Sequence, residues 1–201
     1  ILSVVAERPL VIDGAMGSTL QSIELDVATD YLGHENCVDL LVRSRPELIQ
    51  SIHEQFLAAG ADAVETNTFG ANPLVLSEFD AEVSGWAEDL NCEAAEVARA
   101  ACDVHASAGS PRFVLGSMGP GTRLISLSQV SWQEMQASYA TQATGLLRGG
   151  VDAFLIETAQ DLLQVKCAIN GCLQALEAAG RSTLDVPILV SLTIEQTGTM
   201  L

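Results

Sequence analysis

The sequence has few aromatic residues, few basic residues and no long apolar run. Aromatic residues make up 4% of the 201 positions, so aliphatic side chains must build the core. Nine basic residues face 26 acidic ones, and the resulting net charge of −17 repels the phosphates of nucleic acids and anionic membranes. No apolar run approaches the ~18 residues of a membrane-spanning helix, and no basic-then-apolar signal segment opens the chain. We therefore expect a soluble protein with neither nucleic acid nor membrane as partner.

The cysteines lack the spacing of a disulfide framework or a zinc ribbon. There are five, an odd number, and no two form a C-x-x-C pair. Four of them, Cys92, Cys102, Cys167 and Cys172, fall in helix-like apolar patterns, which is typical of buried, reduced thiols. Free thiols indicate a reducing compartment, so a cytoplasmic location is expected.

Fingerprints of nucleotide and metal sites are also missing. The glycines near residue 14 do not form G-x-G-x-x-G, and no lysine precedes Thr122 in the glycine-rich stretch 116–122, as a P-loop requires. There is no H-E-x-x-H motif. The histidines, His34, His53 and His105, are predicted to lie at the surface or its boundary.

Five apolar runs that end in polar residues are the strongest structural signal. They lie at 11–13, 62–68, 113–117, 153–158 and 188–193. The runs are apolar on both faces instead of alternating, which predicts strands of a parallel sheet covered by helices. With 48% hydrophobic residues over a one-domain length, the chain predicts a single domain spanning 1–201.

Helix signals fill the segments between these runs. Helices are expected at 44–60, 86–105, 131–149 and 161–180. Ser44 with Glu47 and Ser131 with Glu134 each predict a capping box, in which the serine and glutamate side chains bond each other's backbone N–H. The stretch from Glu78 to Asp103 is acidic and predicts a solvated helix face, with a docking surface for another module as the alternative.

The alternation of strands and helices predicts an α/β fold with right-handed crossovers. Gly60-Ala61-Asp62-Ala63 is echoed by Gly150-Val151-Asp152-Ala153, about two strand–helix units later. A doubly wound sheet would be complete with five strands and stays open. The other prediction is a (β/α)8 TIM barrel, of which this chain covers roughly the first five units and is C-terminally incomplete.

Polar residues stand at the carboxyl end of each predicted strand. They are Asp13, Glu65 with Thr66 and Asn67, Ser117, Glu157 with Thr158, and Thr193. In a barrel these ends surround one mouth, where the chemistry takes place. Carboxylates and hydroxyls there suit a small polar or zwitterionic ligand. Glu65 is expected to orient a neighbour or to pair with a cation, and 116–121 to make a tight turn that allows close approach.

Four of these segments resemble motifs of the homocysteine S-methyltransferase family. They are 11–18 (VIDGAMGS), 60–69 (GADAVETNTF), 116–120 (GSMGP) and 150–158 (GVDAFLIET). They occur in the family's order over essentially the whole chain, and 60–69 looks most like the cobalamin-dependent methionine synthases.

The resemblance implies a (β/α)8 barrel methyltransferase that binds homocysteine and presents its zinc-activated thiolate for methylation to methionine. Asp13 and Glu157 would hold the substrate ammonium by charge-assisted hydrogen bonds. The backbone amides at Gly14, Ala15 and Met16 would face its carboxylate. Thr66 and Asn67 would lie beside the pocket. Methylcobalamin and methyltetrahydrofolate would act through partner modules that carry the cobalamin and the folate.

The resemblance is incomplete at the metal. The family's zinc ligands are three cysteines, one after the sixth strand and an adjacent pair near the end of the barrel, and none of the five cysteines here matches them. We expect those ligands beyond Leu201, no metal site or catalytic residue in this chain, and no turnover by these 201 residues alone. A betaine- or S-methylmethionine-dependent homocysteine methyltransferase and a non-catalytic α/β binding domain remain alternatives.

Overall fold

The computed structural model describes residues 1–14 and 16–198, and its centre is a parallel sheet. The strands are β1 (Ala63–Glu65), β2 (Phe113–Met118), β3 (Ala153–Ala159) and β4 (Ile188–Leu192). They lie in the order β1-β2-β3-β4, each parallel to its neighbour. Sequential order with parallel pairing confirms the α/β prediction and is the strand arrangement of part of a (β/α)8 barrel.

The first predicted strand is present, but it is shorter than a regular strand. Ile12 forms a single parallel bridge with Ala63. The Asp13 N–H donates to the Ala63 carbonyl (3.1 Å), and the Asp62 N–H donates to the Val11 carbonyl (2.7 Å). Segment 11–13 therefore lies beside β1, and all five predicted strand positions occur in chain order.

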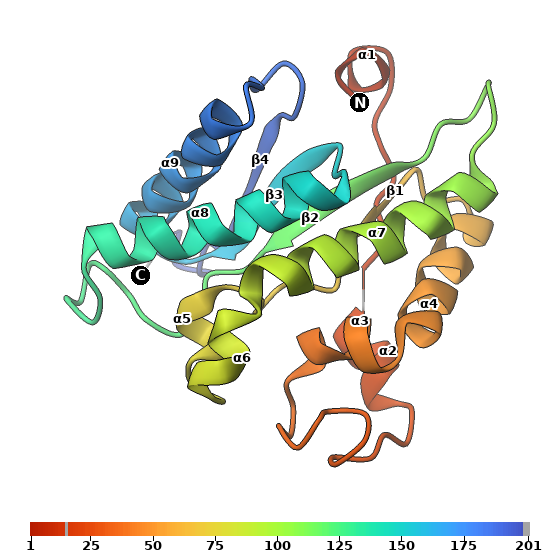
Figure 1. Ribbon diagram of the computed structural model, residues 1–201. Coiled ribbons are helices and arrows are strands. Elements are labelled where there is room, and N and C mark those ends of the chain that lie inside the picture. The colour runs from red at the N-terminus through yellow and green to blue at the C-terminus, as the bar shows by residue number, and fades with distance from the viewer. Residues whose placement is uncertain (15, 199–201) are drawn as a thin grey trace.

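One long helix separates each pair of neighbouring strand positions. The helices are α1 (Leu2–Val5), α2 (Met16–Gln21), the 3-10 turn η1 (Val38–Leu40), α3 (Leu41–Ser44), α4 (Pro46–Ala59), α5 (Pro73–Leu76), α6 (Ala81–Gly85), α7 (Ala87–His105), α8 (Trp132–Gly149) and α9 (Leu162–Ala178). The four long ones match the predicted helices. In Figure 1, α7 and α8 lie in front of the strands, whereas α1 lies at the opposite end of the molecule from α2, α5 and α6.

Only one of the two predicted capping boxes forms. The Ser131 hydroxyl accepts from the Glu134 N–H (3.2 Å), and the Glu134 carboxylate accepts from the Ser131 N–H (3.0 Å). The prediction at Ser44 is wrong. Ser44 is the last residue of α3, and its hydroxyl donates to the carbonyl of Asp30 (2.5 Å). Helix α4 begins instead at Pro46, with Arg45 at its N-cap and no side-chain cap.

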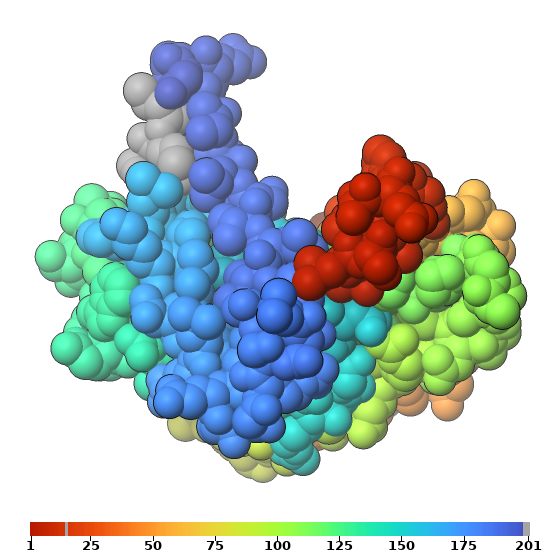
Figure 2. Space-filling model, turned by 90° about the horizontal axis from the view of Figure 1, so that it is seen from above, coloured from red at the N-terminus to blue at the C-terminus, as the bar shows by residue number. Residues whose placement is uncertain are grey.

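Alternating residues divide β1, β2 and β3 between two apolar clusters. The face toward the helices carries Val64, Val114, Phe154 and Ile156, which belong to the main core. The opposite face carries Ala63, Phe113, Leu115, Ala153 and Leu155, which pack against Ile1, Val4 and Leu10 of the N-terminal segment. Figure 2 shows this segment in red, separated by a notch from the dark blue residues near the C-terminal end.

The burial predicted for the fifth strand is wrong. Leu189, Val190 and Leu192 of β4 are between 39% and 43% exposed. Within the described residues β4 pairs with β3 only, so its position at the sheet edge leaves these side chains uncovered.

The internal repeat corresponds to one structural device used twice. Asp62 accepts hydrogen bonds from the Val11 N–H (2.9 Å) and, through both oxygens, from Arg8 (2.7 and 2.8 Å). Asp152 accepts from the Val114 N–H (2.7 Å) and from Arg99 (2.5 Å). Each aspartate thus fastens its own strand to the preceding one. The Arg8 guanidinium is the main reason that the pKa of Asp62 falls to about 2.

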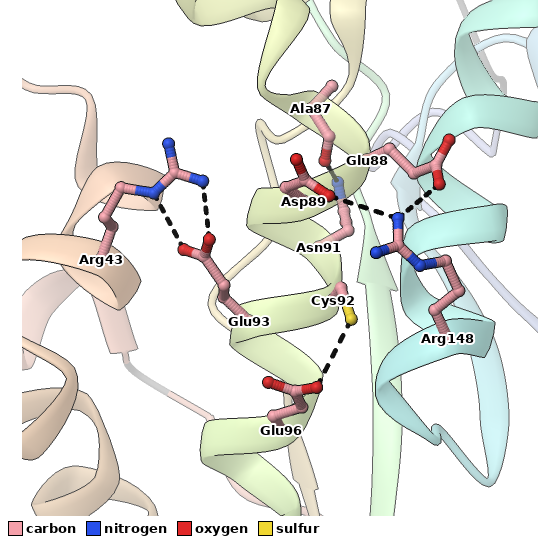
Figure 3. Close-up of polar contacts among 9 residues, drawn as sticks. All are labelled: Arg43, Ala87, Glu88, Asp89, Asn91, Cys92, Glu93, Glu96 and Arg148. Carbon is pink, nitrogen blue, oxygen red and sulfur yellow. Dashed lines mark hydrogen bonds and ion pairs between the residues drawn. The ribbon is translucent and has the colours of Figure 1, made fainter.

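The acidic stretch is tied to neighbouring helices by arginines, as Figure 3 shows. Arg43 of α3 makes two hydrogen bonds to Glu93 (3.0 and 2.6 Å) and lies 5.1 Å from the Trp86 ring centroid. Arg148 of α8 contacts Glu88 at 2.5 Å. The face predicted as solvated is therefore partly neutralised by ion pairs, although exposed pairs of this kind contribute at most about 1 kcal/mol each.

The cysteine predictions are correct at three of four positions. Cys102, Cys167 and Cys172 are buried, as is Cys37, whereas Cys92 is only half-buried on α7. Burial raises the pKa of the Cys37 and Cys102 thiols to about 12, so neither is a ready nucleophile. Among the described residues, no helix has both the length and the apolar character needed to cross a bilayer.

Candidate functional site

A cavity of about 290 Å³ opens at the carboxyl ends of the strands. Glu65, Ser117 and Glu157 reach the cavity because they lie on the strand face that points away from the helices. Each follows, two positions later, an apolar residue of that face in β1, β2 or β3. The lining consists of Asp13, Gly14, Met16, Gly17, Val38, Glu65, Thr66, Asn67, Phe69, Ser117 and Glu157. Six of the seven predicted site residues are in this set, and the seventh, Ala15, lies outside the described residues. The structure thus brings these six together, and their role in binding stays a prediction.

Asp13 is held from behind the cavity. Its Oδ1 accepts from the Glu65 N–H (2.8 Å), and its side chain is only 4% exposed. Its Oδ2 lies 3.8 Å from Nδ1 of His53. The carboxylate is therefore fixed by the end of β1 on one side and faces helix α4 on the other.

Glu157 lies beside an irregularity in β3. The pairing of β3 with β4 shifts register between Ile156 and Ala159, and Thr158 has φ 54°, in the left-handed region. A non-glycine residue in this region carries a local cost on the order of 1–3 kcal/mol. The Glu157 carboxylate accepts a hydrogen bond from the Ser117 hydroxyl. Burial, and to a lesser degree Asp13, raises the pKa of Glu157, while the Ser117 bond opposes this.

Glu65 is the third carboxylate of the cavity. Its backbone orients Asp13, as the sequence predicts, but its side chain has no ion-pair partner among residues 1–14 and 16–198. Burial, followed by the charges of Glu157 and Asp13, raises the pKa of Glu65 to about 8. None of the described lining residues is basic. An ammonium group is the kind of ligand that such a cavity attracts.

Thr66 and Asn67 form a wall in which Thr66 Oγ1 and Asn67 Nδ2 are already hydrogen-bonded. Thr66 Oγ1 accepts from the Ser117 N–H (3.0 Å) and shares a hydrogen bond with Thr68 Oγ1 (2.6 Å). Asn67 donates to the Val38 carbonyl (2.8 Å). These bonds connect the end of β1 to β2 and η1, so the two residues set the shape of the cavity.

The glycine-rich turn after β2 permits the close approach that the sequence predicts. The Gly119 N–H donates to the Phe69 carbonyl (3.0 Å), and a Cβ on Gly119 would lie 2.6 Å from that oxygen. Phe69 and Val38 line the cavity and were not among the predicted site residues. Val38 is revealed only by its contact with Asn67, and Phe69 only by its contact with the turn at Gly119. Both contacts join distant parts of the sequence.

The prediction that His53 lies at the surface or its boundary is wrong. Its side chain is 0% exposed. Its position gives the signal that could have found this, because Ile49, Ile52, His53 and Phe56 are spaced i, i+3, i+4, i+7 on α4 and so share one face. His34 and His105 are half-buried, as expected.

The described lining of the cavity does not form a metal centre. Among the described residues, no three His, Cys, Asp or Glu side chains are placed to hold a metal ion. The buried thiols lie elsewhere in the core clusters. The described residues therefore do not fit a catalytic metal.

Fold and site together define a class. Parallel strands in chain order, covered by helices and ending in an acidic cavity, are characteristic of (β/α) barrel proteins that bind small molecules at the carboxyl ends of their strands. The sequence profile of the family described as homocysteine S-methyltransferase matches residues 10–201. The chain belongs to this family.

Individual relatives agree with this assignment. The chain is 42% identical over all 201 residues to methionine synthase of Mycobacterium tuberculosis, and equally to that of Mycobacterium leprae. It spans 16% of the length of each of these relatives. Its fold resembles the homocysteine methyltransferase MmuM of Escherichia coli, with a TM-score of 0.71 to the metallated form and 0.70 to the oxidized form. The sequences of these structures are 21% and 22% identical to this chain. Each structural match covers 98% of this chain and 68% of the MmuM chain.

Proposed function

We propose that this chain is the homocysteine-binding part of a methionine synthase, a methyltransferase in which the sulfur of homocysteine receives a methyl group to give methionine. The observation that carries the proposal is that Asp13 and Glu157, which lie 144 positions apart in the sequence, line one cavity. The identity of 42% to two methionine synthases supports this donor class over betaine- or S-methylmethionine-dependent enzymes, since the likeness to MmuM at 22% identity concerns the fold alone.

The proposal gives the two ends of the amino acid different partners. Asp13 and Glu157 would bind the ammonium, because two anions at opposed strand ends select a cation that can donate several hydrogen bonds. The same anions repel the substrate carboxylate, which would turn toward the backbone N–H groups at Gly14, Ala15 and Met16. The thiol would then point away from the acidic wall. Thr66 and Asn67 would limit the length of the ligand.

Activation of the thiol is assigned to residues outside this chain. A free thiol has a pKa of about 8.5, and zinc coordination deprotonates it. The metallated form of MmuM shows that a homologous fold takes up metal. We propose that the zinc-binding cysteines follow beyond Leu201, that methylcobalamin and methyltetrahydrofolate act from other modules, and that the protein is cytoplasmic, as its five free cysteines favour.

The test compares homocysteine with 4-mercaptobutanoate, which differs only in lacking the amino group. Calorimetric titrations of the full-length protein should give much tighter binding of homocysteine. Asp13→Asn and Glu157→Gln should each weaken homocysteine binding by about 10- to 100-fold, because each removes a hydrogen bond to a charged group, and should leave the binding of 4-mercaptobutanoate unchanged.

Asp103→Asn serves as the control, since it removes an exposed carboxylate of α7. Equal affinity for the two thiols, or equal effects of all three variants, would reject the proposed substrate site. Methionine formation that persists without cobalamin would instead favour the alternative methyl donors.

A further inference from the structure

His53 is a buried polar side chain without a conventional partner. Both ring nitrogens lack a hydrogen bond among the described residues, and the side chain is 0% exposed. An unsatisfied polar group in a core is destabilising, so a buried histidine needs a compensating role more than an aliphatic residue does. Met or Leu at this position would continue the apolar face of α4 with no such cost.

The charged group that faces the His53 ring is the Asp13 carboxylate. The 3.8 Å from His53 Nδ1 to Asp13 Oδ2 is beyond a hydrogen bond but within reach of one after a shift of under 1 Å. Oδ1 of the same carboxylate is already held by the Glu65 N–H at 2.8 Å. Hydrogen bonds in ligand-free sites are often long and shorten when the ligand binds. His53 is therefore placed to complete the hold on Asp13.

We propose that His53 is a positioning residue: its Nδ1–H donates to Asp13 Oδ2 in the ligand-bound protein and orients that carboxylate toward the substrate ammonium. The inference rests on the proposed function and adds a residue from the opposite side of the sheet. Donation from Nδ1 requires a proton on that nitrogen. The ring would touch no substrate atom and act through Asp13 only.

Two substitutions separate positioning from packing. His53→Leu keeps an apolar side chain of similar bulk but cannot donate, and should weaken homocysteine binding about tenfold. His53→Asn can present its amide near the place of Nδ1 and should stay within about threefold of the unmodified protein. Neither should alter the binding of 4-mercaptobutanoate, which has no ammonium for Asp13 to hold.

Ile52→Val is the matched control, because it trims a buried side chain next to His53 on the same helix. It should affect both thiols equally and slightly. If His53→Leu binds homocysteine as the unmodified protein does, the inference is wrong. If it weakens both thiols equally, His53 has a packing role alone and the inference is also wrong.

A measurement on the unmodified protein avoids any folding defect of the variants. In protein labelled with ¹⁵N at histidine, the His53 resonances should show a protonated Nδ1, and homocysteine but not 4-mercaptobutanoate should shift them. An unprotonated Nδ1 in the homocysteine complex would overturn the inference. The Asp13→Asn variant separates a failure of the proposed substrate site from a failure of the inference about His53. If it leaves homocysteine binding intact, the proposed site fails, whereas if it weakens binding and His53→Leu does not, only the role of His53 fails.

Discussion

Asp13, Glu65 and Glu157 share one cavity, yet each is in a different environment. Asp13 has a backbone donor and Glu157 has a hydroxyl donor, whereas the Glu65 carboxyl has no ion-pair partner within the part of the chain that the structure describes. Three negative charges in one half-buried cavity repel each other, so protonation of one relieves the others. Glu65 is the residue that takes up this proton, and at neutral pH the cavity carries fewer charges than its three carboxyl groups suggest.

The raised pKa of Glu65 predicts how stability depends on pH. Because its pKa is about 8 in the folded protein and near 4.5 in the unfolded chain, the folded state holds the proton more tightly. The stabilisation is complete below pH 4.5 and is lost as pH rises through 8. Glu65→Gln removes this loss, so the free energy of unfolding of the variant relative to the unmodified protein should increase from pH 5 to pH 8.5.

Urea unfolding at several pH values measures this difference. Glu177→Gln, at an exposed position of α9, is the control and should run parallel to the unmodified protein. Parallel curves for Glu65→Gln as well would contradict the raised pKa.

At this scale the sequence predicts most of the site but not how its residues are held. Asp13 and Glu157 follow apolar runs, so the pattern of strand ends reveals them. The approach of His53 to Asp13 joins residues 40 positions apart, from a helix and a strand edge, and depends on how α4 packs. Local periodicity puts His53 on the inner face of α4 but does not say which residue it meets.

Glycines determine how closely the long helices pack. A Cβ on Gly145 of α8 would lie 2.2 Å from the Glu88 carbonyl of α7, and one on Gly149 would lie 2.4 Å from the Cys92 carbonyl. Gly171 of α9 has a similar contact with α8, where a Cβ would lie 2.8 Å from the Ala140 nitrogen. Because backbone cannot move aside as a side chain can, these contacts hold the helices at their present separation.

Gly145→Ala should therefore destabilise the protein by about 1–3 kcal/mol, even though alanine favours helix more than glycine does. Thermal and urea unfolding would measure the change. Gly85→Ala is the matched control, since its Cβ would meet nothing within 4 Å, and it should be neutral or slightly stabilising. A neutral Gly145→Ala would mean that α7 and α8 can separate without cost.

Ser131→Ala should cost about 1 kcal/mol, because it removes the hydroxyl that caps α8. The free energy of unfolding is the measurement. Gln133→Ala, an exposed change in the same first turn, should lie within about 0.5 kcal/mol of the unmodified protein. If the two variants were equally stable, the capping box would contribute nothing.

The two serine motifs show where prediction of elements stops. Ser44 and Ser131 have the same spacing to a glutamate, and only Ser131 caps a helix. The difference comes from what precedes the motif: helix α3 runs up to Ser44, so its backbone is already helical. The uncovered face of β4 is a second case, since the sequence of a strand does not state whether a neighbour lies beside it.

The charge of the whole molecule predicts a response to salt. With a net charge of −17, repulsion spread over the surface opposes the compact state, and the few arginine pairs offset only part of it. Raising NaCl from about 10 mM to about 0.5 M should increase the free energy of unfolding, because the screening length falls severalfold. KCl should act equally. A decrease with either salt would show that the ion pairs outweigh the repulsion.

The overall architecture is the best predicted feature, since it depends on many weak signals that agree. Five strand positions, four long helices and the repeat of Gly60 to Ala63 at Gly150 to Ala153 all recur in the structure. The precise lining of the cavity is less predictable, because Val38 at the start of η1 and Phe69 in the turn after β1 belong to short segments whose path no periodic pattern describes.

Segment 11–13 is attached to β1 and its flanking residues at both ends. At its first residue, Asp62 accepts hydrogen bonds from Arg8 and from the Val11 N–H. At its last residue, Asp13 accepts a hydrogen bond from the Glu65 N–H at the cavity. Between these two attachments, a single parallel bridge from Ile12 to Ala63 joins the segment to β1. The position of Asp13 at the cavity thus depends in part on Arg8, at the opposite end of the same segment.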